Sequence, residues 1–566
     1  MQSANLEPIK LAGSMAILLS LTDSHAYCTG VTRRNLLRFI AWAAISALGC
    51  STALAADAPT APRKPNVVFI LADDLGYSDL GCYGSEIETP NLDRLAANGL
   101  RFSQFYNTAR CWPSRAALLT GYYAQQVNRD PQGNRPKWAA LLPEMLRDAG
   151  YRSYHSGKWH IDGKILDGGF SRSYHTTDHD RFFSPKHHQL DDLPLEPPGP
   201  RENYYATAAT AQRAVEWLAG HESAHPQKPF FLYLAFLAPH FPLHALPEDL
   251  ARYRDRYRQG WDVIRAERWQ RMRKMGLVSG EISAPEAMLA PSWNLNEQEL
   301  QKRIGPGESG HAVPWNDLSP EQREFQAQKM AIHAAMIDRM DQEIGRVLEK
   351  IRGMSAWDDT LIFFASDNGA SAEQIIRGDG HTIGSVPGSA QSYLGLGPGW
   401  STVSNTPFRR HKSWNHEGGT STPLIAHWPR GIAAKGELRH APGHLVDIVP
   451  TLLELAGITT PSLWNDQARP TLPGRSLVPL FAGDTAVAHE PIFFKHMDNR
   501  GLRLGDWKIV AAGKGAPWEL YNLAQDRAES QNLADKHPDK LRELLTIWTA
   551  RDAEYARQGA TGTPLR

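Results

Sequence analysis

An apolar run without polar alternation, Val67–Leu71, places the strongest constraint on how this chain can fold. A strand of this kind is buried on both faces, as in a parallel sheet that is covered by helices on each side. Similar runs occur at Phe230–Phe236 and Leu361–Ala365, and helical patterns lie between them at Ala206–Ala219 and Pro320–Arg352. Strands that alternate with helices predict an α/β fold, with a large mixed and mostly parallel sheet sandwiched by helices.

The C-terminal part of the chain has a different pattern. Short strand signals at Ile492–Lys495 and Trp507–Ala511 precede a final helical pattern at Asp539–Tyr555. This order indicates a small α+β subdomain with an antiparallel sheet. We therefore predict four segments: an N-terminal extension with an export signal over 1–55, a linker over 56–65, a large α/β domain over 66–457 and the subdomain over 458–566.

The N-terminal segment resembles an export signal. Thr32–Leu37 contains a pair of arginines and resembles a twin-arginine motif, Phe39–Leu48 is apolar, and Ala53–Ala55 offers a small-residue cleavage site. The apolar stretch is too short to serve as a resident membrane span. We therefore expect a periplasmic or secreted protein that meets an export machinery. The alternative is a lipid anchor on Cys50, within a lipobox-like sequence.

Charge and cysteine content exclude several classes of function. Lys plus Arg and Asp plus Glu both number 61, so no net field recruits nucleic acid or an anionic membrane. Any attraction for an anionic ligand must therefore come from a local group of positive charges.

Of the four cysteines, Cys28 and Cys50 lie in or before the signal, which leaves Cys82 and Cys111. Two cysteines make no disulfide framework, and we expect Cys82 to be a packed structural thiol.

The segment Cys111–Gly121 places a cysteine at a helix N-terminus. Pro113 suits the first helical turn and Gly121 suits the residue that ends a helix. Free backbone N–H groups and the helix dipole favour anions at such a terminus, and Arg115 adds a positive charge one turn later. The alternative is a buried cysteine beside a surface arginine, because free cysteine is often buried.

Two acidic pairs follow apolar strands and suggest a metal site. Asp73 and Asp74 come directly after the first strand, and Asp367 and Asn368 follow the strand at Leu361–Ala365. The carboxyl ends of parallel strands are where open α/β sheets bind ligands. Three carboxylates and one amide oxygen suit Ca²⁺, with Mg²⁺ or Mn²⁺ as weaker candidates, and nothing here offers a zinc set. Helix capping is the alternative for either pair alone.

Four further basic residues stand where they could surround an anion. Lys158 and His160 occur in Gly-Lys-Trp-His, His240 follows a strand, and Lys412 lies in His-Lys-Ser-Trp-Asn-His. Singly, each is better explained as structural or solvated. Together with Arg115, they provide charge and proton donors around a tetrahedral dianion.

These residues resemble the pattern of the type I, formylglycine-dependent sulfatases, within the alkaline phosphatase-like superfamily. The likeness is strongest to bacterial arylsulfatases and extends from about Asn66 to the C-terminus. The segments that carry it are Cys-Trp-Pro-Ser-Arg-Ala-Ala-Leu-Leu-Thr-Gly, Leu-Ala-Asp-Asp-Leu-Gly, Gly-Lys-Trp-His, Ser-Asp-Asn-Gly, Glu-Gly-Gly-Thr-Ser-Thr-Pro-Leu-Ile and Trp-Glu-Leu-Tyr-Asn-Leu. One departure is Ile161–Gly163, where family members commonly continue with Leu-Gly.

The resemblance implies a modified nucleophile and a bound metal ion. A formylglycine-generating enzyme would oxidise Cys111 to formylglycine (3-oxoalanine), whose hydrate attacks sulfur. The implied ligands of Ca²⁺ are Asp73, Asp74, Asp367 and Asn368, with the modified Cys111 facing the ion.

The resemblance also assigns roles to the basic residues. Arg115 would stabilise the hydrate, while Lys158 and Lys412 would hold sulfate oxygens. His240 would protonate the departing oxygen, and His160 would accept the proton that accompanies release of sulfate. The implied activity is that of a sulfuric ester hydrolase acting on a small-molecule or carbohydrate sulfate ester.

Two other functions stay open at this point. Phosphonate monoester and phosphodiester hydrolases share the Cys-x-Pro-Ser-Arg motif and the acidic metal set. A non-catalytic binder of sulfated glycans would result if Cys111 is never oxidised.

Overall fold

The computed structural model describes residues 64–178, 180–199, 201–378, 380–484 and 491–560. Within it, Lys64–Arg566 forms one compact unit. The predicted twin-arginine motif, apolar stretch, cleavage site and Cys50, with nearly all of the linker, lie outside the described residues. No helix among the described residues has the length and apolar character needed to cross a membrane. The predicted boundary between residues 457 and 458 stays a prediction.

Within the described residues, eleven strands form the main sheet. In chain order they are β1 (Asn66–Asp73), β2 (Leu100–Tyr106), β3 (Arg152–Gly157), β4 (Arg172–Thr176), β5 (His188–Leu190), β6 (Leu193–Leu195), β7 (Phe230–Pro239), β8 (Thr360–Ser366), β9 (Ser421–His427), β10 (Glu437–Arg439) and β11 (Gly443–His444).

The strand order confirms the predicted mixed sheet. It runs β10-β2-β9-β8-β1-β7-β3-β4-β5-β6, and β11 also pairs with β2. The central strands β8, β1, β7, β3 and β4 are parallel to one another. Strand β9 runs antiparallel to both β8 and β2, and β5 runs antiparallel to β4 and β6. The parallel centre brings the carboxyl ends of β1 and β8 to the same edge of the sheet.

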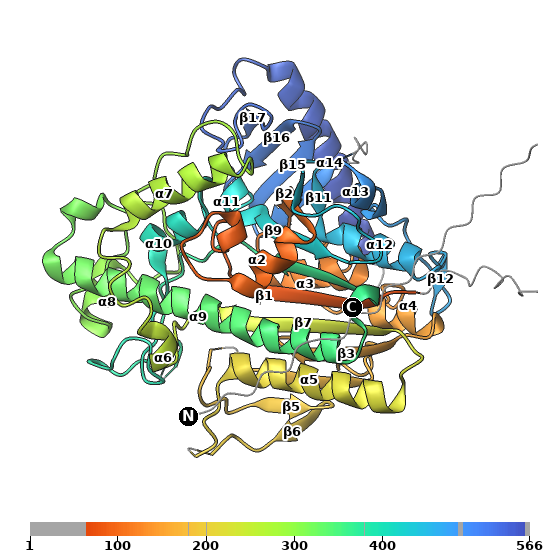
Figure 1. Cartoon of the computed structure of the whole chain (residues 1–566). Helices are drawn as coiled ribbons and strands as arrows, with labels where there is room; N and C mark the ends of the chain where they lie inside the picture. Colours follow the sequence, from red (N-terminus) through yellow and green to blue (C-terminus); the bar gives the residue numbers. More distant parts are fainter. Residues whose placement is uncertain (1–63, 179, 200, 379, 485–490, 561–566) are drawn as a thin grey trace, which may run out of the picture. The chain divides into compact units, whose positions relative to one another are not determined.

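Helices cover both faces of this sheet (Figure 1). Val68 and Ile70 of β1 pack in one core, which includes the apolar residues of α5 and α9. Phe69 and Leu71 pack in a second core with α3, α4 and α12. The helices are α2 (Pro90–Ala97), α3 (Cys111–Thr120), α4 (Leu142–Asp148), α5 (Ala206–Ala224), α6 (Pro247–Leu250), α7 (Trp261–Lys274), α8 (Glu297–Arg303), α9 (Pro320–Gly353), α10 (Gly397–Ser404), α11 (Glu417–Thr420), α12 (Ile448–Leu455), α13 (Val478–Ala482) and α14 (Pro538–Ala560).

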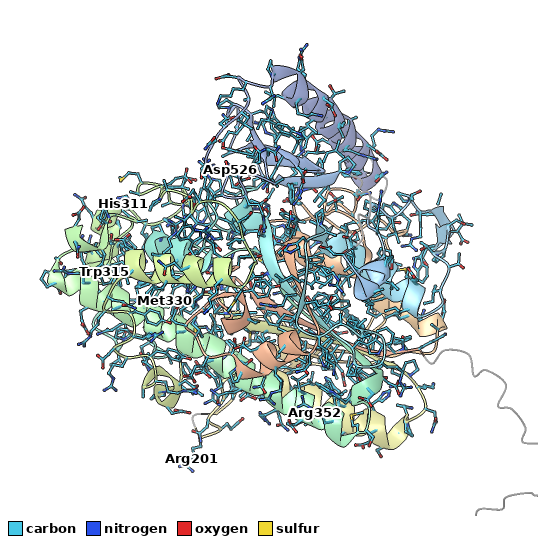
Figure 2. The ribbon with its side chains drawn as sticks, turned by 45° about the horizontal axis from the view of Figure 1, so that its top comes forward. Arg201, His311, Trp315, Met330, Arg352 and Asp526 are labelled. Carbon is cyan, nitrogen blue, oxygen red and sulfur yellow. The ribbon has the colours of Figure 1, made fainter. Side chains whose placement is uncertain are left out.

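The long helix α9 begins and ends almost where the sequence predicts. Its N-cap Ser319 accepts a hydrogen bond from the backbone N–H of Gln322, and the Gln322 side chain accepts one from the Ser319 N–H in return. This reciprocal pairing satisfies two backbone donors at the start of the helix. Figure 2 labels Met330 and Arg352, which lie far apart along this helix.

One segment that reads as a surface loop is partly a buried helix. The Gly, Ser and Pro content of 376–405 predicts a long loop, but α10 occupies its end. Trp400 of α10 is fully buried, and its indole N–H donates to the carbonyl of Gln326 at 2.7 Å. A side chain at Gly399 would meet the Trp261 ring at 2.6 Å. Here the glycine permits close packing between α10 and α7, rather than marking a loop.

The arginine-rich helix α7 also differs from expectation. Its composition predicts a solvated face, yet Arg265 and Arg268 are buried. Arg268 pairs with Asp79 at 2.6 Å and with Glu86 at 2.7 Å. These acidic partners lie far away in the sequence, so Arg268 binds α7 to the loop after β1, whereas Arg265 donates to Ser283.

The C-terminal subdomain contains the predicted antiparallel sheet. Its four strands are paired in the order β14-β15-β16-β17, and α14 packs against β15 and β16 (Figure 1). The strands are β14 (Ile492–His496), β15 (Asn499–Leu504), β16 (Trp507–Ala511) and β17 (Glu519–Asn522); a separate pair consists of β12 (Leu463–Trp464) and β13 (Gln467–Ala468). Its core joins Phe493 and Trp548 to Ala117 of α3, so the subdomain shares a core with the helix that carries Cys111.

Buried charges join this subdomain to the large sheet. Lys508 Nζ of β16 lies 2.8 Å from Glu417 Oε1 and 2.9 Å from Glu529 Oε1, and all three side chains are inaccessible to solvent. Arg527 adds a second ion pair to Glu417 at 3.1 Å. Because buried ions lose their hydration, each stays stable only while its partners remain.

We expect Lys508→Ala to lower the free energy of unfolding by about 3–5 kcal/mol, because Glu417 and Glu529 would lose their shared cation while buried. Urea unfolding followed by fluorescence measures this change. Lys540→Ala is the control, since Lys540 pairs with the exposed Glu543 at the surface and should cost less than about 1 kcal/mol. Equal effects of the two substitutions would contradict this account of the junction.

Candidate active site

The ends of two neighbouring parallel strands bring the acidic residues together. Asp73 ends β1, and Asp367 directly follows β8. The Asp367 N–H donates to the Ala72 carbonyl at 3.1 Å, and the Asp74 N–H donates to Asp367 Oδ1 at 3.3 Å. Asn368 Nδ2 donates to Asp74 Oδ1 at 2.7 Å. The structure therefore gathers Asp73, Asp74, Asp367 and Asn368 into one buried cluster.

Arg115 reaches this cluster from helix α3. Its Nη2 lies 2.7 Å from Asp367 Oδ2, and its Nε donates to the same oxygen at 2.9 Å. Its Nη1 donates to the carbonyl of Lys158 at 3.0 Å. The guanidinium is fully buried, and this one residue joins helix α3 to the end of β8 and to the segment after β3.

The two lysines pair with different carboxylates. Lys158 Nζ forms a buried ion pair with Asp73 Oδ2. Lys412 Nζ lies 2.7 Å from Asp74 Oδ1 and 3.2 Å from Glu373 Oε2. Both ammonium groups are almost wholly removed from solvent. They thus place two fixed positive charges beside the acidic cluster.

Cys111 is the first residue of α3, as predicted, and it is buried. The helix ends at Gly121, whose φ of 77° is left-handed. Ser114 fixes the preceding turn, because its Oγ accepts the Thr108 N–H at 3.0 Å and lies 2.8 Å from Thr108 Oγ1. Burial raises the pKa of the Cys111 thiol, although Lys158 and Lys412 oppose this shift. An unmodified Cys111 is therefore held mainly as the weakly nucleophilic thiol.

The three carboxylates differ in their ionisation. Burial and the adjacent Asp73 raise the pKa of Asp367 to about 7. Burial also raises the pKa of Asp74, even though Lys412 opposes this. Burial pushes the pKa of Asp73 upward as well, but the charges of Lys158, His240 and Arg115 hold it well below its usual range.

The donor atoms of the cluster fit a divalent cation. Asp73 Oδ1 and Asn368 Oδ1 are buried and have no hydrogen-bond partner among the described residues. Asp73, Asp74 and His240 each offer a ligand atom within 4.8 Å of one another. Buried oxygens rarely stay unpaired, and oxygen-rich donor sets suit hard divalent ions. Asp367 instead directs Oδ2 to Arg115 and Oδ1 to the Asp74 N–H.

The two predicted histidines occupy different places. His240 Nε2 lies 3.7 Å from Asp74 Oδ2, and its Nδ1 is hydrogen-bonded to the Phe241 carbonyl. His160 lies beside Trp112, the neighbour of Cys111, with 5.6 Å between the ring centroids. Its Nε2 is 3.3 Å from Gln132 Nε2. His240 thus belongs to the acidic cluster, whereas His160 stands beside the N-terminus of α3.

Sequence reasoning missed two charged residues of the site. Glu373 Oε1 accepts from Arg110 Nη2 at 3.2 Å, while its other oxygen faces Lys412. Arg110 precedes Cys111 and donates through Nη1 to Ser413 Oγ at 2.8 Å. The position of Glu373 shortly after Asp367 and Asn368 was the available signal, because residues there lie near the carboxyl end of β8.

The fold is a helix-covered, mostly parallel sheet, and its site gathers buried carboxylates, two lysines and an arginine at the carboxyl ends of β1 and β8. The chain belongs to the sulfatase family, whose profile matches residues 65–458. A second profile, for the C-terminal region of N-sulphoglucosamine sulphohydrolase, matches residues 410–547. The protein is therefore a sulfatase, a hydrolase of sulfate esters.

Similar proteins cover most of the chain. A sulfatase of Schizosaccharomyces pombe is 30% identical over 87% of this chain and 94% of its own length. An arylsulfatase of Klebsiella aerogenes is 30% identical over 70% of this chain and 87% of its own length. The crystal structure of Ps i-CgsB in complex with k-i-k-neocarrahexaose has a TM-score of 0.61 at 23% identity, over 88% of this chain and 94% of that one, which shows the shared fold.

We expect Arg115→Lys to lower the free energy of unfolding by about 3 kcal/mol or more, because a lysine cannot keep the paired contact with Asp367 and the bond to the Lys158 carbonyl. Denaturant unfolding in the presence of a chelator measures this loss. Arg258→Lys is the matched control, since Arg258 is exposed and pairs with the exposed Asp255. A change in Arg115→Lys no larger than in the control would show that Arg115 does not hold the cluster together.

Proposed function

We propose that this sulfatase hydrolyses sulfate monoesters to an alcohol or phenol and inorganic sulfate, through a formylglycine hydrate made from Cys111 and with Ca²⁺ in the acidic cluster. The observation that carries the proposal is the position of Cys111. It begins α3, is buried, and lies within the electrostatic influence of Lys158 and Lys412. A nucleophile near two fixed cations suits a substrate whose reacting group is an anion.

The absent groups would supply two kinds of chemistry. The hydrated aldehyde has two hydroxyl groups, one to attack sulfur and one whose deprotonation expels sulfate and restores the aldehyde. Ca²⁺, held by Asp73, Asp74, Asp367 and Asn368, would polarise a sulfate oxygen and oppose the charge of the nucleophile. The two unpaired oxygens, on Asp73 and Asn368, support this placement.

The basic side chains would bind and orient the sulfate group. Lys158 and Lys412 are each fixed by a carboxylate, so little reorganisation is needed when sulfate oxygens arrive. Arg115 holds Asp367 in place and would stabilise the hydrate on the neighbouring turn of its own helix.

The histidines would move the protons. The carbonyl of Phe241 accepts from His240 Nδ1, which leaves Nε2 directed toward the site. When the ring is protonated, Nε2–H can therefore donate to the departing ester oxygen. His160, beside Trp112, would accept the proton that is lost as sulfate leaves.

The relatives support a broad substrate class. Those that match this chain include proteins named arylsulfatase and N-acetylgalactosamine-6-sulfatase. We therefore propose a small-molecule or carbohydrate sulfate ester as the substrate. A formylglycine-generating enzyme and the export machinery are the proposed partners, and a periplasmic or secreted location is proposed from the twin-arginine-like sequence.

We expect Cys111→Ala to abolish sulfate release while the protein still folds, because only the nucleophile is removed. Mass spectrometry of the tryptic peptide Cys111–Arg115, from protein made in its native host, tests the oxidation directly.

A second measurement distinguishes the proposed sulfatase from a phosphodiesterase. It compares the rate of release of inorganic sulfate from an aryl sulfate with the rate of hydrolysis of an aryl phosphodiester. An unmodified cysteine in active protein would exclude the formylglycine mechanism, and faster phosphodiester hydrolysis would favour the phosphodiesterase alternative. Retention of a sulfated glycan without sulfate release would indicate a binder.

We expect Ca²⁺ to stabilise the protein after treatment with a chelator, because the ion binds only the folded state. At a free concentration 100-fold above its Kd, the gain is about 2.7 kcal/mol. Thermal unfolding with and without Ca²⁺ measures the shift in Tm. Asp73→Asn should lose this shift, whereas the exposed Asp255→Asn should keep it. An equal shift in both variants would place the ion elsewhere.

A further inference from the structure

A layered stack of side chains borders the N-terminus of α3. The guanidinium of Arg110 lies over two indole rings, 5.2 Å from the Trp112 centroid and 5.7 Å from the Trp293 centroid. The ring of His160 lies 5.6 Å from Trp112 on a plane tilted by 58°. Because Arg110 and Trp112 flank Cys111 on either side in the sequence, the stack stands directly beside the nucleophile.

Trp293 is fixed in this stack by the residues of the site. Its indole N–H donates to Glu373 Oε1 at 2.9 Å, and the other oxygen of Glu373 lies 3.2 Å from Lys412 Nζ. The neighbouring Asn294 donates to the Ala372 carbonyl at 2.9 Å and accepts from the Gln374 N–H at 3.0 Å. These bonds hold the segment of Trp293 against the loop that follows Asp367 and Asn368.

The same ring is open to solvent. Trp293 is 40% exposed, and it is the only tryptophan among the described residues that is classed as exposed rather than buried or half-buried. Arg110 occupies one side of the ring, and Glu373 fixes its edge. Core packing does not need a rigidly held indole that remains exposed, whereas stacking on a ring of a bound ligand does need one.

We propose that Trp293, supported by Arg110 and Glu373, is the subsite for the leaving group, and that it selects sulfate esters of ring alcohols over those of acyclic alcohols. The proposal rests on the proposed sulfatase mechanism, because Lys412 fixes where the sulfate group lies. The shared chemistry of the favoured substrates is a six-membered ring next to the ester oxygen. That ring can be aromatic and flat, as in a phenol, or saturated and puckered, as in a sugar, since the face of an indole packs against both.

Three esters with six carbons each distinguish an aromatic ring, a saturated ring and an acyclic chain: phenyl sulfate, cyclohexyl sulfate and n-hexyl sulfate. We expect Trp293→Ala to raise KM for a ring ester about tenfold, which is the size of one aromatic stacking contact, with little change in kcat. The ratio of kcat/KM between ring and n-hexyl esters should fall by the same factor. Differences in intrinsic reactivity among the three esters do not affect the result, because the variant is always compared with the parent enzyme on the same ester. Loss for phenyl sulfate alone identifies an aromatic leaving group, and loss for both ring esters indicates that the subsite accepts aromatic and saturated rings.

Two controls separate binding from structural damage. Trp293→Phe keeps a flat ring and should retain most of the preference. Met288→Ala, a 71% exposed residue on the same segment, should leave all three esters unaffected. An equal fall in kcat on all three esters would overturn the proposal, because it would mean that Trp293 acts only by holding Glu373. Unchanged selectivity would overturn it as well.

The proposed subsite can be tested even if the proposed sulfatase mechanism fails. If the parent enzyme releases no sulfate from any ester, the proposed mechanism fails, and calorimetry on the Cys111→Ala protein takes the place of kinetics. The Kd of phenyl or cyclohexyl sulfate should then rise about tenfold on adding Trp293→Ala, relative to n-hexyl sulfate. Equal Kd values for all three esters, with or without Trp293, would overturn the subsite.

Discussion

The pairing of buried carboxylates with buried cations is the constraint on which the whole site depends. Asp73 and Asp367 lie beside each other at the ends of β1 and β8, where two ionised carboxylates would repel. Arg115 from α3 and Lys158 from the segment after β3 compensate for them. Removing a single partner would leave an uncompensated charge away from water, which is far more costly than keeping the set intact. The carboxyl edge of the sheet and the nucleophile helix are therefore held in one arrangement.

The central strands were predictable because they are buried on both faces. A strand in that position cannot alternate polar and apolar residues, so β1, β7 and β8 stand out as continuous apolar runs. The structure extends each run by two or three residues in total. The short strands β5, β6, β10 and β11 were not predictable, since two or three partly polar residues carry no period. Helix α10 was missed for another reason: its glycines allow close approach to Trp261, and only the tertiary fold reveals this.

The same distinction applies to the site. Asp73, Asp74, Asp367 and Asn368 were found because their position at strand ends follows from the fold class. Glu373, Arg110 and Trp293 were not, because their roles come from contacts between distant segments. Trp293 and Glu373 are 80 residues apart, and Arg110 and Glu373 are 263 apart. No local pattern relates such residues. In α7, likewise, the composition predicts a solvated face, because the acidic partners that bury Arg268 belong to the distant loop after β1.

Helix α3 contributes residues to three cores, and this affects how sequence variation in the protein would be interpreted. Its first residue is Cys111, while Ala117, less than two turns later, packs with Phe493, Leu502 and Trp548 of the C-terminal subdomain. A change in that distant core can tilt the helix that carries Cys111 without touching any residue of the proposed active site. Substitutions in this subdomain could therefore abolish activity in the same way as substitutions in the active site. Their cause would be visible in the orientation of a helix rather than in the identity of a catalytic group.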